Sequence, residues 1–285
     1  MTVSTAVPGA VSAPPPAPRP PAPRVPYRAT APRAPAAGIG ESLVLDPSRP
    51  LYVSHVRGPL TVAVVSIAWL RERSEADRAA LRERYLWDEE AARLATLHLP
   101  KRRSEWLAGR LAVKHSVCAY LRRHGGAATA PHEVRVRPVA DGIRAGRPTV
   151  NAPVDVGLSH SGDLAVAVCG PRTVGIDLES DRPVPPLLAE LLAVDRVGAR
   201  TPGRRRLAAM PLPLRWACRE AVLKHFGFGL RIGAQEVELR GWKDDGRFSW
   251  RAGPELRRRV PVADGRRFDS WAGRFGDYFL ALVWQ

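Results

Sequence analysis

Two segments of this chain follow the same pattern, and this internal repeat constrains the fold more than any other feature. Residues Trp106–Lys114 read WLAGRLAVK, and residues Trp216–Lys224 read WACREAVLK. A tryptophan begins each segment, a lysine ends it, and three strand-like segments follow it. A repeat of this size predicts two similar α/β lobes, an α+β architecture in which a pseudo-two-fold axis relates the lobes. The cleft between such lobes is the natural place for a ligand.

Hydrophobic periodicity predicts the elements of each lobe. Glycines at 125–126 and at 227 are expected to end the two repeated helices. The segments with helical spacing are 74–99, 105–122 and 214–226. The segments that read as strands are 60–70, 133–139, 148–151, 164–169, 174–179, 236–240, 247–251 and 278–284.

Composition separates a first segment from the two lobes. Residues 1–40 hold eleven of the 28 prolines and no acidic residue. Because proline removes a backbone donor and fixes φ, this segment is expected to be a disordered Pro/Ala-rich tail. We expect an N-terminal lobe at 41–171 and a C-terminal lobe at 172–285 that carries a metal site.

Cysteine usage and charge narrow the class of protein. Cys118, Cys169 and Cys218 lie far apart without a CxxC pair, which argues against a disulfide framework or a zinc site and favours a reducing cytoplasm. The sequence contains no uncharged apolar stretch of about 18 residues, so we expect no membrane-spanning helix. The net charge of +16 favours polyanionic partners, namely nucleic acid, an acidic protein or a phosphorylated cofactor.

Three carboxylates and one lysine are the candidates for chemistry. In VGIDLE, Asp177 and Glu179 share one face of a strand, and in the second repeated helix Trp216, Glu220 and Lys224 lie along one stripe. Taken separately, these could be a solvated edge strand and a surface ion pair. Taken together, the carboxylates form a hard oxygen site that suits Mg²⁺, with phosphate oxygens completing its shell.

The segment GLSHSG at 157–162 supplies polar side chains just before a buried strand. It does not match the GxSxG pattern of a hydrolase nucleophile. His160 could clamp a phosphate between two serines or could be a satisfied structural residue. Arg110 and Arg147 could hold phosphate oxygens with two hydrogen bonds each, or could simply be surface arginines.

Four motifs in order, GRP, GLSHSGDLAVAV, VGIDLE and WACREAVLK with HFGFGL, resemble those of the surfactin-type 4′-phosphopantetheinyl transferases. The resemblance covers about Trp106 to Leu230. It implies two similar α/β lobes and transfer of phosphopantetheine from coenzyme A to a serine of an acidic apo carrier protein. It also implies Mg²⁺, or Mn²⁺ in its place, and a working monomer.

The resemblance also implies roles for individual residues. Asp177, Glu179 and Glu220 would hold the metal, Glu220 would take the serine proton, and Lys224 would neutralise the leaving phosphate. The residues that would contact the coenzyme are Ser159, His160, Arg110, Arg147 and Arg219. Arg147 and Arg219 stand where the family has lysine, which puts the detailed geometry of the coenzyme contacts in doubt.

Three other classes remain open at the level of sequence. A basic module that binds nucleic acid would need its arginines gathered on one face with stacking aromatics, whereas here they are spread along the chain. A different magnesium-dependent phosphotransferase or hydrolase of nucleotides would use the same carboxylates. A scaffold without turnover would keep the fold but would not need Asp177, Glu179, Glu220 and Lys224 together.

Overall fold

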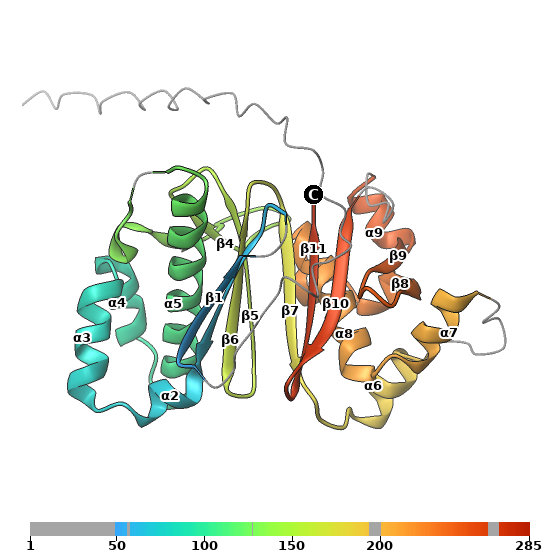
Figure 1. Cartoon of the computed structure of the whole chain (residues 1–285), viewed down its shortest axis with the longest axis horizontal. Helices are drawn as coiled ribbons and strands as arrows, with labels where there is room; N and C mark the ends of the chain where they lie inside the picture. Colours follow the sequence, from blue (N-terminus) through green and yellow to red (C-terminus); the bar gives the residue numbers. More distant parts are fainter. Residues whose placement is uncertain (1–48, 56–57, 127, 194–200, 262–267) are drawn as a thin grey trace, which may run out of the picture. The chain divides into compact units, whose positions relative to one another are not determined.

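Two antiparallel sheets lie at the centre of the described chain, and one long helix covers the outer face of each (Figure 1). The computed structural model describes residues 49–55, 58–126, 128–193, 201–261 and 268–285. The tail expected at 1–40 lies outside these residues. The architecture is mixed α/β with several small antiparallel sheets.

The elements follow one another along the chain in two comparable series. The first half contains β1 (Leu51–His55), β2 (Thr61–Ser66), α2 (Ile67–Glu72), α3 (Glu75–Tyr85), α4 (Asp88–Ala95), α5 (Pro100–Arg123), β3 (Val136–Pro138), β4 (Pro148–Val150), β5 (Asp155–Ser161) and β6 (Leu164–Gly170). The second contains β7 (Val174–Ser180), α6 (Pro186–Leu191), α7 (Pro202–Ala209), α8 (Leu212–Phe226), β8 (Val237–Trp242), β9 (Phe248–Ala252), α9 (Pro254–Arg259), β10 (Asp269–Phe275) and β11 (Tyr278–Trp284).

The strand order is the same in both series apart from the additional strand β1. One sheet has the order β1-β2-β6-β5 and the other the order β10-β11-β7. In the first sheet β6 pairs with β2 and β5, and in the second sheet β11 pairs with β7 and β10. The pairs β3–β4 and β8–β9 form separate hairpins, each following the long helix of its series.

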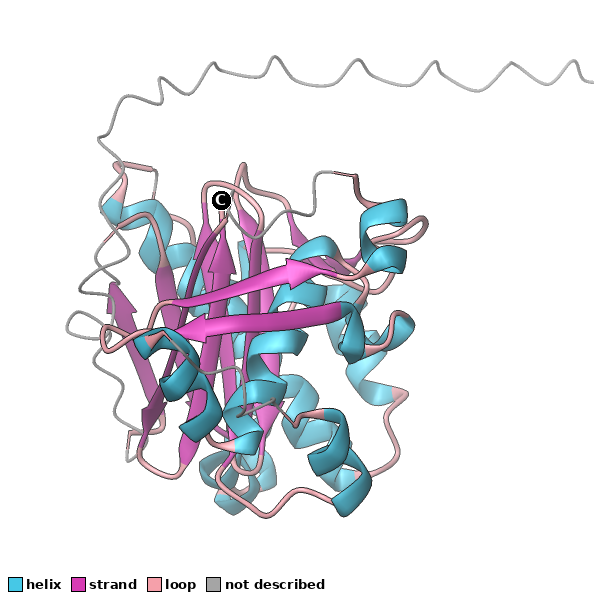
Figure 2. Cartoon of the chain, turned by 90° about the vertical axis from the view of Figure 1, so that its right-hand side faces the viewer, coloured by secondary structure: helices cyan, strands magenta, loops and turns pink. Residues whose placement is uncertain are grey.

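Alternating side chains of one strand show how the layers are held together. On β11, Phe279, Ala281 and Val283 belong to the core beneath α8, whereas Leu280 and Leu282 belong to a core shared with β2 and β6 of the other sheet. A strand buried on both faces reads as a continuous apolar run, as YFLALVW does. The layers are therefore helix, sheet, sheet and helix. Figure 2 shows helices and two crossing strands in front of the upright strands.

Close backbone packing sets the position of α8 on β7. A Cβ atom at Gly175 would lie 2.1 Å from the carbonyl oxygen of Ala221 and 2.6 Å from the backbone nitrogen of His225. At Gly157 on β5, a Cβ atom would lie 2.9 Å from Cγ2 of Ile176. Both glycines let main chains approach where a side chain would hold them apart. As a result β5, β7 and α8 lie against one another.

Several elements agree with the sequence expectations. Helix α8 ends at Gly227, whose φ is 87°, and α5 ends at Arg123, just before Gly125–Gly126. The strands expected at 164–169, 174–179 and 278–284 are β6, β7 and β11. The three cysteines are buried and free. Among the described residues, no helix is long and apolar enough to cross a membrane.

Two expectations are wrong in their boundaries. The strand expected at 60–70 ends at Ser66, because the Ser66 hydroxyl accepts a hydrogen bond from the Trp69 backbone nitrogen (3.1 Å) and begins α2. The helical segment 74–99 is two helices, α3 and α4, since the Glu90 carboxylate accepts from the Trp87 backbone nitrogen (3.3 Å) and starts a new helix there.

The packing at Gly175 predicts a specific loss of stability. The variant Gly175→Ala should lower the free energy of unfolding by about 1–3 kcal/mol or more, because the new methyl group overlaps backbone atoms of α8 that cannot rotate away. Urea unfolding measures the loss. The control is Gly203→Ala in α7, where a Cβ atom would lie 3.7 Å from its nearest neighbour, the carbonyl oxygen of Trp242, so stability should be unchanged or higher. Equal stability for the two variants would contradict this account of the packing.

Candidate functional site

Three neighbouring elements carry six of the residues singled out in the sequence. Strands β5 and β7 run side by side in the same direction. Two hydrogen bonds establish this arrangement. The Val174 backbone nitrogen donates to Asp155 at the first residues of the two strands, and the Ser180 backbone nitrogen donates to the Ser161 hydroxyl at their last residues. Helix α8 packs against β7 on the side opposite the apolar face of Val174, Ile176 and Leu178. The residues brought together are Ser159 and His160 on β5, Asp177 and Glu179 on β7, and Glu220 and Lys224 on α8.

Asp177 is the centre of this group. Its Oδ1 atom accepts hydrogen bonds from the Ser159 hydroxyl (2.8 Å) and from the Lys224 ammonium group (2.5 Å). Lys224 also donates to the Ser159 hydroxyl oxygen (3.1 Å). Lys224 keeps 30% of its side chain exposed, whereas the Asp177 side chain is 4% exposed. This contact joins α8 to β7 and β5 at the level of the candidate site.

The structure corrects one expectation about Asp177. The sequence pattern placed this carboxylate on a solvent-facing side of the strand, but α8 covers that face and Asp177 is buried. Glu220 is buried as well, one helical turn from Lys224. Among the described residues, the Oδ2 atom of Asp177 and the Oε1 atom of Glu220 have no hydrogen-bond partner. Buried polar atoms are normally paired with protein, water or a ligand, so both oxygens are available to accept from one.

Burial raises the pKa of two of the carboxyl groups. The pKa of Glu220 is raised from 4.5 to about 7, mainly by burial, with the charges of Asp177 and Glu179 adding to the effect and Lys224 opposing it. The pKa of Glu179 is also raised to about 7, mainly by burial and by the Asp177 charge, while Arg182 and Lys224 oppose the rise. A carboxyl group that titrates near neutral pH is suited to accept or donate a proton there.

The same oxygens are the candidate ligands for a divalent metal. Carboxylate oxygens are the ligands that Mg²⁺ prefers, and the buried oxygens of Asp177 and Glu220 are of this chemical kind. Within the residues that the structure describes, however, no three His, Cys, Asp or Glu side chains are arranged so that they could hold a metal ion. The three-carboxylate magnesium site therefore stays a prediction. A cation here would take the rest of its shell from water and substrate phosphates.

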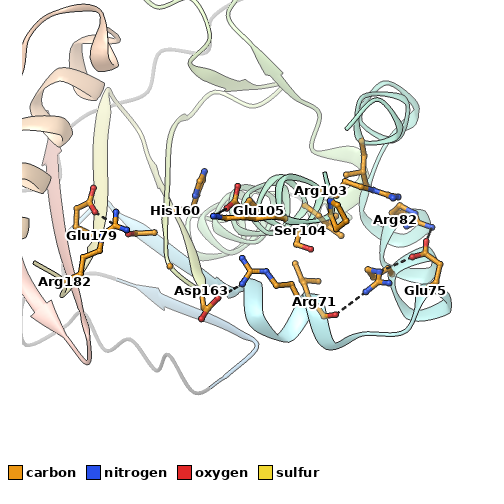
Figure 3. A pocket seen from close by; sticks show the side chains of 18 residues that line it. Arg71, Glu75, Arg82, Arg103, Ser104, Glu105, His160, Asp163, Glu179 and Arg182 are labelled. Atoms are coloured by element: carbon orange, nitrogen blue, oxygen red, sulfur yellow. Dashed lines mark hydrogen bonds and ion pairs between the residues drawn. The ribbon is translucent and has the colours of Figure 1, made fainter. Parts of the chain in front are cut away.

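A cavity of about 970 Å³ opens beside this group. Glu179 and Arg182 line one end of it, and His160, Ser161 and the turn at 162–163 line the wall between β5 and β6. Figure 3 shows Glu179 and Arg182 at one end of the cavity and Arg82 at the other. His160 is the expected residue that reaches the cavity from GLSHSG, and burial among protein atoms lowers its pKa.

The far wall of the cavity comes from α2, α3 and the start of α5. It carries a group of cationic side chains, namely Arg71, Arg78, Arg82, Lys101 and Arg103. Some of this charge is balanced within the wall, since Arg82 contacts Glu75 (2.8 Å) and Arg71 contacts Asp163 (2.7 Å). Sequence reasoning missed this wall, because a chain so rich in arginine gives no signal for which guanidinium groups share a cavity.

Three other predicted coenzyme contacts lie elsewhere. Arg110 stacks on the Trp106 ring, with 4.6 Å from its guanidinium carbon to the ring centre, and lies beside Glu90. Arg219 is buried and donates to the Leu191 carbonyl oxygen (2.9 Å). Arg147 is bound to protein acceptors at the start of β5 and β7. None of the three lines the cavity.

Comparisons with known proteins add little to this geometry. No family model matches the chain, and a search of curated proteins finds no match. Among solved structures, the chain is similar to a holo-(acyl-carrier-protein) synthase from Bacillus anthracis in complex with CoA (3′,5′-ADP), at 22% identity and a TM-score of 0.31. The match covers 39% of this chain and 92% of the other. A likeness of this size leaves the function to be argued from the residues of this chain.

The raised pKa of Glu220 predicts a pH-dependent stability. The folded chain binds this proton more tightly than the unfolded chain, so stability falls as the pH rises from about 4.5 to about 7. Without divalent cations at pH 8, Glu220→Gln should therefore raise the melting temperature by about 2–4 °C, with a smaller rise at pH 5. Scanning calorimetry measures both values. The control is Glu238→Gln, which changes an exposed carboxylate and should leave the melting temperature unchanged at both pH values. An unchanged melting temperature in Glu220→Gln at pH 8 would show that no buried charge is removed.

Proposed function

We propose that this chain transfers the 4′-phosphopantetheine group of coenzyme A to a serine of an apo acyl or peptidyl carrier protein. The observation that carries the proposal is the grouping of Asp177, Glu220 and Lys224 with Glu179, which lines one end of a cavity whose far wall is rich in arginine. A cavity with cations along its wall and carboxylates at its end suits a substrate with several phosphate groups. The four sequence motifs that resemble the 4′-phosphopantetheinyl transferases support the same reaction.

In the proposed reaction the serine hydroxyl attacks the β-phosphorus of coenzyme A. A bond forms between the serine oxygen and that phosphorus, and the bond from the phosphorus to the bridging oxygen breaks, so that 3′,5′-ADP leaves. Glu220, with a pKa of about 7, accepts the serine proton. Lys224 carries a positive charge beside the site and neutralises the leaving phosphate. Phosphoryl transfer depends mainly on such positioning and charge neutralisation.

The remaining site residues hold the substrate. His160, which lines the cavity, contacts the phosphates of the nucleotide, with Ser159 next to it on β5, and the arginines of the far wall neutralise the charge of the nucleotide. Asp177, Glu179 and Glu220 would hold Mg²⁺, or Mn²⁺ in its place, which supplies charge neutralisation to the pyrophosphate when bound. Lys224 donates a hydrogen bond to Oδ1 of Asp177, so Oδ2 is the Asp177 oxygen that would bind a cation.

The partner is an acidic protein, and the chain acts as a monomer. Carrier proteins with acidic surfaces suit a chain of net charge +16, because complementary charge speeds association. All the proposed site residues lie on one chain, and they come from both halves. The cavity therefore requires no second copy.

We also propose that the two halves, 41–171 and 172–285, are similar lobes related by a pseudo-two-fold axis. The matching order of β2, α5, β6 and of β7, α8, β11 supports this proposal. The repeated lysines have taken different roles. Lys114 on α5 is fully buried and paired with Glu90 (2.7 Å), whereas Lys224 on α8 is partly exposed at the proposed site. Of the two repeated helices, α8 is the one that supplies reactive side chains to the proposed site, namely Glu220 and Lys224.

The direct test of the activity is mass spectrometry of carrier proteins. Incubation with coenzyme A, Mg²⁺ and a panel of apo acyl and peptidyl carriers should add the mass of one phosphopantetheine group to the carrier serine. Glu220→Gln should lower the turnover number by about 10²–10⁴-fold, because the proton acceptor is lost. Asp177→Asn, which keeps acceptors for Ser159 and Lys224, should also lose turnover while remaining folded.

Matched controls separate this reaction from the alternatives. Glu238→Gln changes an exposed carboxylate that pairs with Arg240, and it should transfer at the wild-type rate. Release of 3′,5′-ADP without any mass gain on a carrier would favour a hydrolase of nucleotides instead. No mass gain and no consumption of coenzyme A across the panel would refute the proposal.

A further inference from the structure

One guanidinium group contacts all three elements that carry the candidate site. Arg147, just before β4, donates from Nη1 to the His225 carbonyl oxygen of α8 (3.0 Å) and from Nη2 to the Val174 carbonyl oxygen of β7 (2.6 Å). Its Nη2 also contacts the Asp155 carboxylate on β5. Asp155 in turn accepts a hydrogen bond from the Val174 backbone nitrogen (2.8 Å). We call this group, Arg147 with Asp155, Val174 and His225, the Arg147 clamp.

The contact on α8 meets a need of the helix itself. His225 lies in the last turn, where helix carbonyl groups lack partners within the helix. A cation there satisfies one such carbonyl and interacts favourably with the negative end of the helix dipole. Arg147 is 7% exposed, so water competes little for these donors. The clamp therefore fixes the end of α8, and His225 is the residue next to Lys224.

The clamp lies away from the cavity. Asp155 and Val174 are the first residues of β5 and β7, whereas His160 and Glu179 lie near the last residues of the same strands. Strands of seven residues span about 20 Å at roughly 3.3 Å per residue. Arg147 does not line the cavity, and its donors already face protein oxygens.

We propose that Arg147 is a positioning residue, which holds β5, β7 and α8 in register so that Asp177, Glu220 and Lys224 meet, and that it does not bind the substrate. This inference rests on the proposed function for its kinetic readout, but the clamp itself is independent of the substrate. The planar guanidinium reaches several acceptors in fixed directions, which a single ammonium group cannot do. Replacement by lysine should therefore loosen the clamp while keeping the charge.

The experiment compares Arg147→Lys with the wild type and with Arg144→Lys. Arg144 is an exposed neighbour that contacts the Thr173 hydroxyl (3.3 Å), so Arg144→Lys controls for a change of arginine to lysine in the same region. In Arg147→Lys we expect the turnover number to fall by about 10- to 100-fold, since small displacements of reacting groups cost this much. The dissociation constant for coenzyme A, measured by calorimetry, should stay within about twofold of the wild type.

Amide hydrogen exchange gives a readout that does not depend on turnover. In Arg147→Lys, exchange should become faster in peptides covering 174–180 and 212–226, because the contacts that hold β7 to the end of α8 are weakened. Arg144→Lys should exchange as the wild type does. If the wild type proves unable to modify any carrier, the proposed function fails, and hydrogen exchange alone still decides the clamp.

Two results would overturn the inference. A large rise in the dissociation constant for coenzyme A with unchanged turnover and unchanged exchange would make Arg147 a substrate contact. If Arg147→Lys instead keeps the turnover, coenzyme affinity and hydrogen exchange of the wild type, the contacts of Arg147 do not position the site. Should Arg147→Lys fail to fold, Asp155→Asn weakens the same clamp while keeping an oxygen acceptor, and the same pattern of slower turnover, faster exchange and unchanged affinity is expected.

Discussion

The close approach of α8 to β7 is the constraint on which the candidate site depends. At Gly175 the backbone of the helix comes so near the strand that no side chain fits between them. This approach buries Asp177 and Glu220 and brings Lys224 within 2.5 Å of Asp177. Burial raises the pKa of Glu220 to about 7 and leaves carboxylate oxygens without partners. A single packing feature thus accounts for the burial of both carboxylates and for the raised pKa of Glu220.

Two sets of contacts along the strands hold these three elements together. In the middle of β7, the Ser159–Asp177–Lys224 contacts join β5, β7 and α8. At the first residues of β5 and β7, Arg147 and Asp155 join the same three elements. Glu179 and His160, which lie toward the last residues of the two strands, line the cavity. The contacts of Arg147 therefore lie at the end of the strands away from the cavity.

The sequence was sufficient for the local parts of this arrangement. Alternation in VGIDLE predicted β7 and its inward face of Val174, Ile176 and Leu178, and the stop at Gly227 predicted the end of α8. The meeting of Asp177 with Lys224 followed from the resemblance and from the assumption that two lobes share a cleft. The burial of Asp177 did not follow, because the alternating pattern of a strand cannot reveal that a helix covers its polar face.

Arginine is the residue type whose contacts the sequence left least determined. Arg147, Arg110 and Arg219 were predicted as coenzyme contacts, whereas the structure binds them to protein carbonyl groups, a carboxylate or an indole ring. The arginines that do line the cavity, such as Arg82 and Arg103, carried no motif. A guanidinium group binds backbone carbonyls and phosphates with the same donors, so only the tertiary structure decides between the two.

A crystal structure with coenzyme A and Mg²⁺ bound tests the central claim most directly. The account predicts that the pyrophosphate lies between Lys224 and the arginines of the cavity wall, with the Asp177 and Glu220 oxygens facing the cation and Arg147 still bound to Val174 and His225. A coenzyme bound outside this cavity, or a cation held by residues other than these carboxylates, would contradict it.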